Sequence, residues 1–348
     1  MPRWLSPRLY SALRVCGLRV DEAYEVGYSG TMSSPPPPAA GVRLPWARMP
    51  ARLPAALTAW LGATVVAATT QPGGFSPGVA ARVQASDGRR VFVKAVGPEL
   101  NADTPGLYRQ EARVVAALPP TAPVPRLLWT QDEGPEGWVM LVFEDIDGQI
   151  PAQPWRPEEL DRVLDALVAL SAALTPVVVE SASETFATAI CGWRRLRRAP
   201  PAQLDGWSAR HLAALADLEA RAAEAVRGDT LLHLDLRADN LLLTSERVYV
   251  VDWPWARIGA AWVDLVGMAP SVAMQGGPDP EVLLARHPAA VSAPPAAVTA
   301  TVAAVAGYFT WSALQPAPPG LPTVRAFQAA QGDVARRWLA QRLGEADG

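Results

Sequence analysis

The sequence predicts an α+β protein with two unequal lobes, a small strand-rich part followed by a larger helical part. The first observation is a strand pattern over residues 64–97, which contains an Asp-Gly turn pair, and a further apolar strand over residues 137–148. The second observation is that apolar residues recur at helical spacing in the rest of the chain. The polar exit of the later strand places the junction of the lobes near residues 145–150.

Helical periods flank and follow these strands. One helix is expected over residues 51–63, and a second over residues 104–120, where prolines end it. The part of the chain beyond the junction contains further helical periods at residues 157–174, 209–226, 297–309 and 324–343.

The N-terminal segment differs from the rest of the chain. Residues 32–41 read "MSSPPPPAAG", a run that favours extended polyproline conformation over helix or sheet. We therefore expect residues 1–49 to be a mobile, Pro-rich extension, with Met32 as an alternative start of the chain.

Composition excludes several classes of function. A formal net charge of −3 gives no general affinity for nucleic acid, and two cysteines are too few for a disulfide framework. The long uncharged stretches 53–81 and 288–324 are interrupted by Gly or Pro and are rich in Ala and Thr, so we interpret them as buried segments of a soluble protein and not as membrane spans. No signal-peptide cleavage site follows the N-terminal arginines, so a cytoplasmic location is expected.

One small predicted hairpin carries hard oxygen donors. When its turn is centred on residues 245–246, Asn240 lies opposite Val251 and Asp252 follows at the same end, while Asp235 lies on the loop that enters the hairpin. Mg²⁺ prefers a few such oxygens together with phosphate oxygens and water. Taken singly, each residue is explained as a turn former. The set H-x-D-x₄-N, followed by a strand that ends in Asp, is typical of phosphoryl-transfer kinases.

Two more residues near Asp235, His233 and Arg237, need an interpretation. We interpret His233 as a hydrogen-bonded scaffold residue. Arg237 is either a solvated charge or a cation that reaches the transferring phosphoryl group and stabilises its charge.

These motifs resemble those of the aminoglycoside phosphotransferase and choline kinase-like family. The segment "HLDLRADN" at residues 233–240 is similar to the catalytic loop of the family, and "VDWPWARIGAAWVDL" at residues 251–265 is similar to its metal motif. The resemblance spans about residues 50–345 and implies a bilobal protein kinase-like fold.

The resemblance also implies roles for individual residues. Asp235 is expected to be the catalytic base, Asn240 and Asp252 to hold Mg²⁺, and Asp264 to brace the catalytic loop and cap the next helix. Leu234 departs from the family pattern, which often has glycine here. In the family, this position does not contact substrate.

A kinase also needs a glycine-bearing loop over the phosphates. The segment "QPGGFSPGVAARV" at residues 71–83 is the candidate, although an ordinary glycine hairpin has the same appearance. A Walker A loop is excluded, since Val-Ala stands where Lys-Ser/Thr is required. The candidate phosphate-binding residues are Gly73, Gly74, Ser76 and Gly78.

Lys94 lies inside an apolar strand and calls for a carboxylate partner. On the helix 104–120, Glu111 shares one face with Leu107 and Val114, so an unpaired carboxylate there is costly to bury. We expect a Lys94–Glu111 pair that fixes the lysine against the α- and β-phosphates, a role that the resemblance also assigns. Glu99, in a loop, is the competing partner.

The connector between the lobes is the candidate adenine site. In kinases, backbone groups of this segment bind the base, which makes Phe143, Glu144 and Asp145 candidates through N–H or C=O groups. A plain linker between lobes has the same sequence pattern.

We expect an ATP- or GTP-dependent, Mg²⁺-dependent phosphotransferase that acts on a hydroxyl of a small molecule and resembles aminoglycoside phosphotransferases. Macrolide, choline, homoserine or sugar kinases are alternatives, as is a catalytically inactive kinase fold that acts as a binding module. A protein kinase is disfavoured because Asp-Phe-Gly and Ala-Pro-Glu motifs are missing. The expected organisation is an extension (1–49), a nucleotide-binding N-lobe (50–147) and a catalytic, acceptor-binding C-lobe (148–348).

The acceptor site is the least specified part of the prediction. A cationic acceptor requires acidic side chains in the helical lobe, and the tryptophans near the metal motif are alternative floor residues for an acceptor, although tryptophans more often belong to a core. The acidic candidates are Asp147, Glu158, Asp161, Asp165 and Asp205, and the aromatic ones are Trp253, Trp255 and Trp262.

Overall fold

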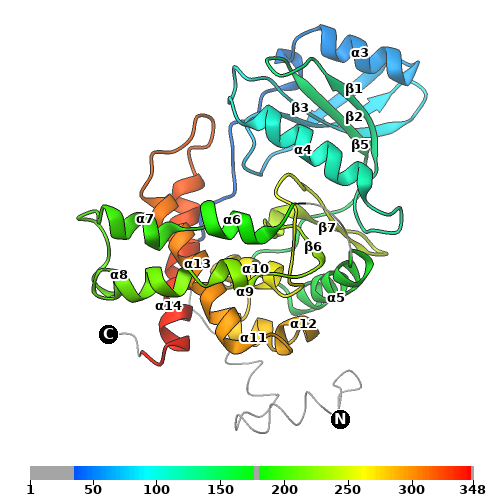
Figure 1. Ribbon diagram of the computed structural model, residues 1–348. Helices are drawn as coiled ribbons and strands as arrows, with labels where there is room; N and C mark the ends of the chain where they lie inside the picture. The colour runs from blue at the N-terminus through cyan, green and yellow to red at the C-terminus, as the bar shows by residue number, and fades with distance from the viewer. Residues whose placement is uncertain (1–34, 176–179, 346–348) are drawn as a thin grey trace, which may run out of the picture.

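The computed structural model describes residues 35–175 and 180–345 and has two lobes (Figure 1). The N-lobe contains a five-stranded antiparallel sheet in the order β1-β2-β3-β5-β4. Its strands are β1 (Val65–Thr70), β2 (Val79–Ala85), β3 (Arg90–Val96), β4 (Leu127–Asp132) and β5 (Val139–Glu144). Its helices are the short η1 (Trp46–Arg48), α3 (Arg52–Leu61) and α4 (Thr104–Ala117).

The two faces of this sheet pack against different helices, because successive side chains of a strand point to opposite sides. Val93 of β3 belongs to the core that contains Leu53 and Leu57 of α3. Lys94, the next residue, pairs in register with Leu141 of β5, which belongs to the core that includes α4. The lysine therefore points toward α4 and the space between the lobes.

The C-lobe is mainly helical and carries two short two-stranded sheets. Its helices are α5 (Pro157–Ala173), α6 (Ala182–Thr188), α7 (Gly192–Arg198), α8 (Gly206–Glu219), α9 (Ala222–Ala225), η2 (Ala238–Asn240), α10 (Val263–Met274), α11 (Pro280–Leu284), α12 (Pro288–Val291), α13 (Pro295–Ala313) and α14 (Val324–Arg342). The paired strands are β6 (Thr230–Leu232) with β9 (Arg257–Gly259), and β7 (Leu241–Leu243) with β8 (Val248–Val250).

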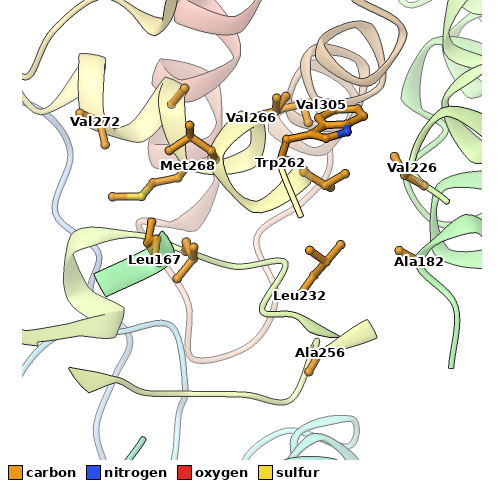
Figure 2. Close-up of a cluster of buried hydrophobic side chains, with 14 of the residues drawn as sticks. Leu167, Ala182, Val226, Leu232, Ala256, Trp262, Val266, Met268, Val272 and Val305 are labelled. Atoms are coloured by element: carbon orange, nitrogen blue, oxygen red, sulfur yellow. The ribbon is translucent and has the colours of Figure 1, made fainter. Parts of the chain in front are cut away.

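A buried apolar cluster anchors the loops that carry the polar motif. Leu232 of β6 and Ala256 before β9 belong to the same buried cluster as Trp262, Val266 and Val305 (Figure 2). The loop that follows Leu232 is therefore anchored in the core at its first residue. The same holds for the segment between β8 and β9.

Helix α13 is long and apolar enough to cross a membrane, but 61% of its apolar stretch is buried inside the protein. Its side chains pack mainly against α14 and α7 (Figure 1). This burial agrees with the interpretation of residues 288–324 as a core segment.

Sequence periodicity identified six of the longer helices and missed the short helices and α10. Helices α3, α4, α5, α8, α13 and α14 lie where they were expected, whereas α6, α7, α10, α11 and α12 were not predicted. Helix α10 is apolar on nearly all sides, so it lacks the polar face that a period search requires. Strand β4 was also missed, since it is a half-exposed edge strand of six residues.

The first residues of the described chain differ from expectation. Residues 1–34 of the predicted mobile extension, and Cys16 with them, lie outside the described residues. Residues 40–44 are hydrogen-bonded to other segments, and Met49 is buried against α3. The proline run gave no sign of this packing. The lobe boundaries at residues 50 and 148 remain a prediction.

Candidate functional site

A cavity of about 370 Å³ lies between the sheet of the N-lobe and the β7–β8 hairpin of the C-lobe. It is lined by the glycine-bearing loop at residues 71–76, by β3, by the end of β5 and by the segment 239–242. Most of the residues selected from the sequence line this cavity: Gly73, Gly74, Ser76, Lys94, Glu111, Phe143, Glu144, Asp145, Asn240 and Asp252.

The predicted pair between Lys94 and Glu111 is present. Lys94 Nζ donates to Glu111 Oε2 at 2.5 Å and to Asp252 Oδ1 at 2.6 Å, so one ammonium bridges the two lobes. Burial alone would lower the pKa of Lys94, but the carboxylates of Asp252 and Glu111 outweigh it and raise that pKa. The alternative partner Glu99 instead accepts a hydrogen bond from Trp138 Nε1 at 2.8 Å.

The hairpin brings Asn240 and Asp252 to one end, as predicted from its register. Leu241 pairs with Val250, and Val251 N–H donates to Asn240 O at 3.0 Å. Asp252 follows with a positive φ of 70°, which turns the chain out of the strand toward Lys94.

The donor set at this end fits a magnesium ion shared with phosphate. Asn240 Nδ2 donates to Asp235 O at 2.8 Å, which leaves the amide Oδ1 as the donor for a cation. The Asp252 side chain is 36% exposed to solvent and lines the cavity. Among the described residues, no group of three or more His, Cys, Asp or Glu side chains forms a closed metal cage. Two protein oxygens completed by phosphate and water are what Mg²⁺ accepts at nucleotide sites.

Asp235 lies beside this end of the hairpin in an ion-pair network. Its carboxylate contacts Arg237 Nη1, and Arg237 also donates to both oxygens of Asp239 at 3.0 and 2.9 Å. Burial raises the pKa of Asp235 to about 6, with Arg237 opposing the shift. The carboxylate is thus ionised at neutral pH and close to the range in which it exchanges protons.

The structure excludes one of the two interpretations of Arg237, the solvated charge. Its side chain is 10% exposed, and its guanidinium lies 5.4 Å from the ring centroid of Phe75. It is therefore not a solvated charge. Its contacts with Asp235 and Asp239 hold the carboxylate of Asp235 in place, and contact with a phosphoryl group remains a prediction.

His233 is a scaffold residue, as expected. It is fully buried, its Nε2 donates to Val251 O at 2.9 Å, and its Nδ1 accepts from Asp235 N–H at 3.2 Å. Burial lowers the pKa of this imidazole, which favours the neutral form.

Asp264 braces the loop, as the family resemblance implied. It accepts hydrogen bonds from His233 N–H at 2.7 Å and Leu234 N–H at 2.8 Å. Leu234 has a φ of 61°, which lies in a backbone region that favours glycine. This conformation explains the preference for glycine in similar loops. The carboxylate thus fixes the loop in a conformation that its own sequence disfavours.

The glycine-bearing loop bends where two glycines adopt positive φ. Gly73 has φ 89° and Gly74 has φ 73°, and Ser76 Oγ lies 2.8 Å from the hydroxyl of Tyr108 on α4. Gly78 differs from the prediction because it does not line the cavity. A Cβ on it would lie 2.3 Å from Ala95 O, so glycine is required there for close packing on β3.

The connector residues lie at the edge of the cavity, but their side chains are engaged elsewhere. Glu144 accepts from Arg126 N–H and its guanidinium at 2.9 and 3.0 Å, and Asp145 pairs with Arg82 and Arg90 at 3.1 and 2.7 Å. The Glu144 N–H donates to Arg126 O. An adenine site at this connector therefore relies on other backbone groups, and the site remains a prediction.

Several cavity residues were missed in the sequence. Phe92 and Arg82 share the face of Lys94, so strand alternation could have identified them. Asp239 was hidden as a loop residue beside Asn240. Arg43 comes from the segment that was expected to be mobile, and no local pattern marks it.

Comparisons with known proteins agree with this architecture. The family model described as "Phosphotransferase enzyme family" matches residues 69–316, which is more than half of the 348 residues. A search of curated proteins found no match.

Solved structures share the fold at low sequence identity. A choline kinase from Streptococcus pneumoniae is 16% identical, with 82% of this chain and 98% of that chain covered and a TM-score of 0.55. An aminoglycoside phosphotransferase in a ternary complex with AMP-PNP and hygromycin B has the same identity and coverage and a TM-score of 0.54. A spectinomycin phosphotransferase in complex with ADP and spectinomycin is 13% identical, with 82% and 97% covered and a TM-score of 0.50. Because the family model spans most of both lobes and the bilobal kinase-like fold is shared, this chain belongs to the phosphotransferase enzyme family.

Proposed function

We propose that this protein transfers the terminal phosphate of ATP or GTP to a hydroxyl of a small molecule, with Mg²⁺ as cofactor. The observation that carries the proposal is the position of Lys94 Nζ, 2.5 Å from Glu111 and 2.6 Å from Asp252. Protein kinases require for activity both an ion pair between a strand lysine and a helix glutamate and a metal-motif aspartate that binds Mg²⁺, and Lys94, Glu111 and Asp252 supply these groups.

Each polar group has a distinct task in the proposed reaction. Asp235 orients the acceptor hydroxyl and takes its proton as the acceptor oxygen bonds to phosphorus, while the bond from phosphorus to the leaving diphosphate oxygen breaks. Lys94 holds the nucleotide phosphates, and Arg237 keeps the Asp235 carboxylate aligned. When bound by Asn240 and Asp252, Mg²⁺ neutralises negative charge on the phosphates.

Similar proteins support the choice of a nucleotide as phosphate donor. Two of the solved structures with this fold contain AMP-PNP or ADP, together with hygromycin B or spectinomycin. A cytoplasmic location, without nucleic-acid or membrane partners, belongs to the same proposal because nucleoside triphosphates are available there.

The acceptor remains open between aminoglycosides and other hydroxyl compounds such as macrolides, choline, homoserine or sugars. Asp205 caps α8, and Asp161 pairs with Arg286, so both acids have structural roles. Trp253 and Trp262 are buried, as core tryptophans are, whereas Trp255, within the metal motif, is 46% exposed. Trp255 is therefore the aromatic candidate for acceptor contact.

A catalytically inactive binding module is the alternative function. Such proteins typically lose the lysine, the loop aspartate or the metal aspartate. This chain retains Lys94, Asp235 and Asp252, and Lys94 contacts Asp252. The retained set favours an enzyme.

A coupled ADP-release screen tests the proposal. Wild-type protein and Asp235→Ala are assayed with Mg·ATP against aminoglycosides, macrolides, amino alcohols and sugars. We expect one class to give turnover that Asp235→Ala lowers by about 10²–10⁴-fold. Equal turnover by the two proteins would contradict the role of Asp235, and nucleotide binding without turnover on any class would favour the binding module.

A further inference from the structure

The segment at residues 39–44, here called the strap, is bonded to the glycine-bearing loop. Gly74 N–H donates to Ala39 O at 2.9 Å, and Gly41 N–H donates to Gly74 O at 2.8 Å. Leu44 N–H donates to Gly78 O at 3.2 Å. These backbone bonds hold the strap along the loop from its bend to the start of β2.

The side chain of Arg43 adds a second set of bonds to the same loop. Its Nε and Nη2 donate to Gly73 O at 3.1 and 2.5 Å, and its Nη1 donates to Ser76 O at 2.7 Å. Arg43 also lines the cavity that contains Lys94. Each of the three guanidinium nitrogens thus donates to a carbonyl oxygen of the loop, so this residue shapes the loop.

The bonds to the strap set the direction of the loop peptides. In a trans peptide the C=O and the following N–H point in opposite directions. Since Gly74 C=O points to the strap, the N–H of Phe75 points away from it. A loop with adjacent glycines at positive φ is otherwise free to turn these carbonyls toward phosphate, where they repel it.

The strap is also bonded to the C-lobe. Val42 N–H donates to Gly320 O at 2.8 Å, and Thr323 Oγ1 donates to Ala40 O at 2.7 Å. In Figure 1 the blue segment leaves the N-lobe and runs down toward the α13–α14 end, on the other side of the molecule from α5. The strap thus connects the lobes in addition to the covalent connector before α5 and the contact of Lys94 with Asp252.

The glycine-bearing loop also contacts the C-lobe next to Arg237. Phe75 of the glycine-bearing loop makes an edge contact with Phe327 of α14, with ring centroids 5.3 Å apart. The guanidinium of Arg237, which holds Asp235, lies 5.4 Å from the Phe75 ring and 6.0 Å from the Phe327 ring. Both the strap and residues 320–327 lie outside the range 69–316 that the family model matches.

We propose that the strap holds the glycine-bearing loop in its phosphate-facing conformation and ties that loop to the C-lobe, with Arg43 as the positioning residue. The inference rests on the proposed function, because the loop then serves a nucleotide. A loop that is ordered before binding loses less conformational entropy when the nucleotide arrives, so the strap raises nucleotide affinity.

The test compares Arg43→Gln with a matched control in the full chain. Arg48→Gln makes the same change five residues later, at an exposed position of η1. Hydrogen–deuterium exchange of the nucleotide-free proteins reports the loop, and calorimetry with Mg·AMP-PNP reports affinity. For Arg43→Gln we expect roughly tenfold faster exchange at residues 72–78 and roughly tenfold weaker binding. Arg48→Gln is expected to match the wild type.

Two further readouts separate positioning from general stability. In Arg43→Gln the KM for nucleotide is expected to rise while the KM for acceptor stays unchanged, and Arg43→Lys is expected to restore part of the affinity. Thr323→Val removes one of the two hydrogen bonds between the strap and the C-lobe without touching Arg43, and it is expected to speed exchange at residues 39–44.

The outcomes distinguish the strap from the proposed function. Unchanged loop exchange and unchanged affinity in Arg43→Gln would overturn the strap. A wild type that does not bind Mg·AMP-PNP would overturn the proposed function and the nucleotide role of the strap, whereas faster loop exchange in Arg43→Gln would still support the strap as a clamp on the loop.

Discussion

Replacing Asp235 by asparagine is expected to stabilise the fold near neutral pH while it removes the proposed catalytic base. The carboxyl group is buried beside Arg237, and burial raises its pKa from 3.8 to about 6. A raised pKa means that the folded state disfavours the ionised form relative to the unfolded chain. Asparagine has the same shape without the charge, so it avoids this cost.

The magnitude follows from the shift. About two pKa units correspond to at most about 3 kcal/mol, and the side chain is still 28% exposed, which reduces the effect. Between about pH 4 and pH 6 the folded protein binds more protons than the unfolded chain, so this group makes wild-type stability fall as pH rises. From about pH 5 to pH 7.5 the expected loss is about 1 kcal/mol, and Asp235→Asn does not undergo it.

Thermal unfolding at the two pH values measures this effect. The Tm difference, variant minus wild type, is expected to increase by about 2 °C from about pH 5 to pH 7.5. Asp239→Asn is the matched control, since it removes the other carboxylate that Arg237 binds with two hydrogen bonds, and it is expected to lower Tm near neutral pH. If the Tm difference for Asp235→Asn stays constant or falls with pH, the argument that burial destabilises this carboxylate is wrong.

Three further predictions test the metal site, the lysine pair and the sheet. Asp252→Ala is expected to weaken Mg·ATP binding at least about tenfold in calorimetry and to remove its dependence on Mg²⁺, and unaltered affinity would count against metal ligation. Glu111→Gln is expected to raise the KM for nucleotide, whereas Glu99→Gln, at the competing partner, should leave it unchanged; equal effects would contradict the assigned pairing. Gly78→Ala is expected to lower the free energy of unfolding by about 2–4 kcal/mol, because a Cβ would lie 2.3 Å from a carbonyl oxygen of β3. Gly106→Ala on the open face of α4 is the control and should be neutral or stabilising in the same thermal unfolding assay.

The parts of the site that depend on local geometry were predictable from sequence. The two-residue period of β3 and the helical period of α4 each assign a face, and together they require that Lys94 and Glu111 meet. The register of the β7–β8 hairpin similarly places Asn240 beside Asp252. In both cases one or two short-range rules fix where the side chain points.

The strap was not predictable by such rules. Arg43 contacts a loop about 30 residues away in sequence, and Ala40 contacts Thr323 across 283 residues. A proline-rich segment has unpaired backbone groups and no apolar period, so its own sequence is equally compatible with solvent or with a docked position. What decides between them is the partner: a loop with positive-φ glycines exposes carbonyl oxygens, and a guanidinium with several donors in one plane can bind more than one of them. The glycines therefore allow the loop to bend, and the bent loop creates the acceptors that recruit Arg43, so the docked position depends on both segments and cannot be read from either one alone.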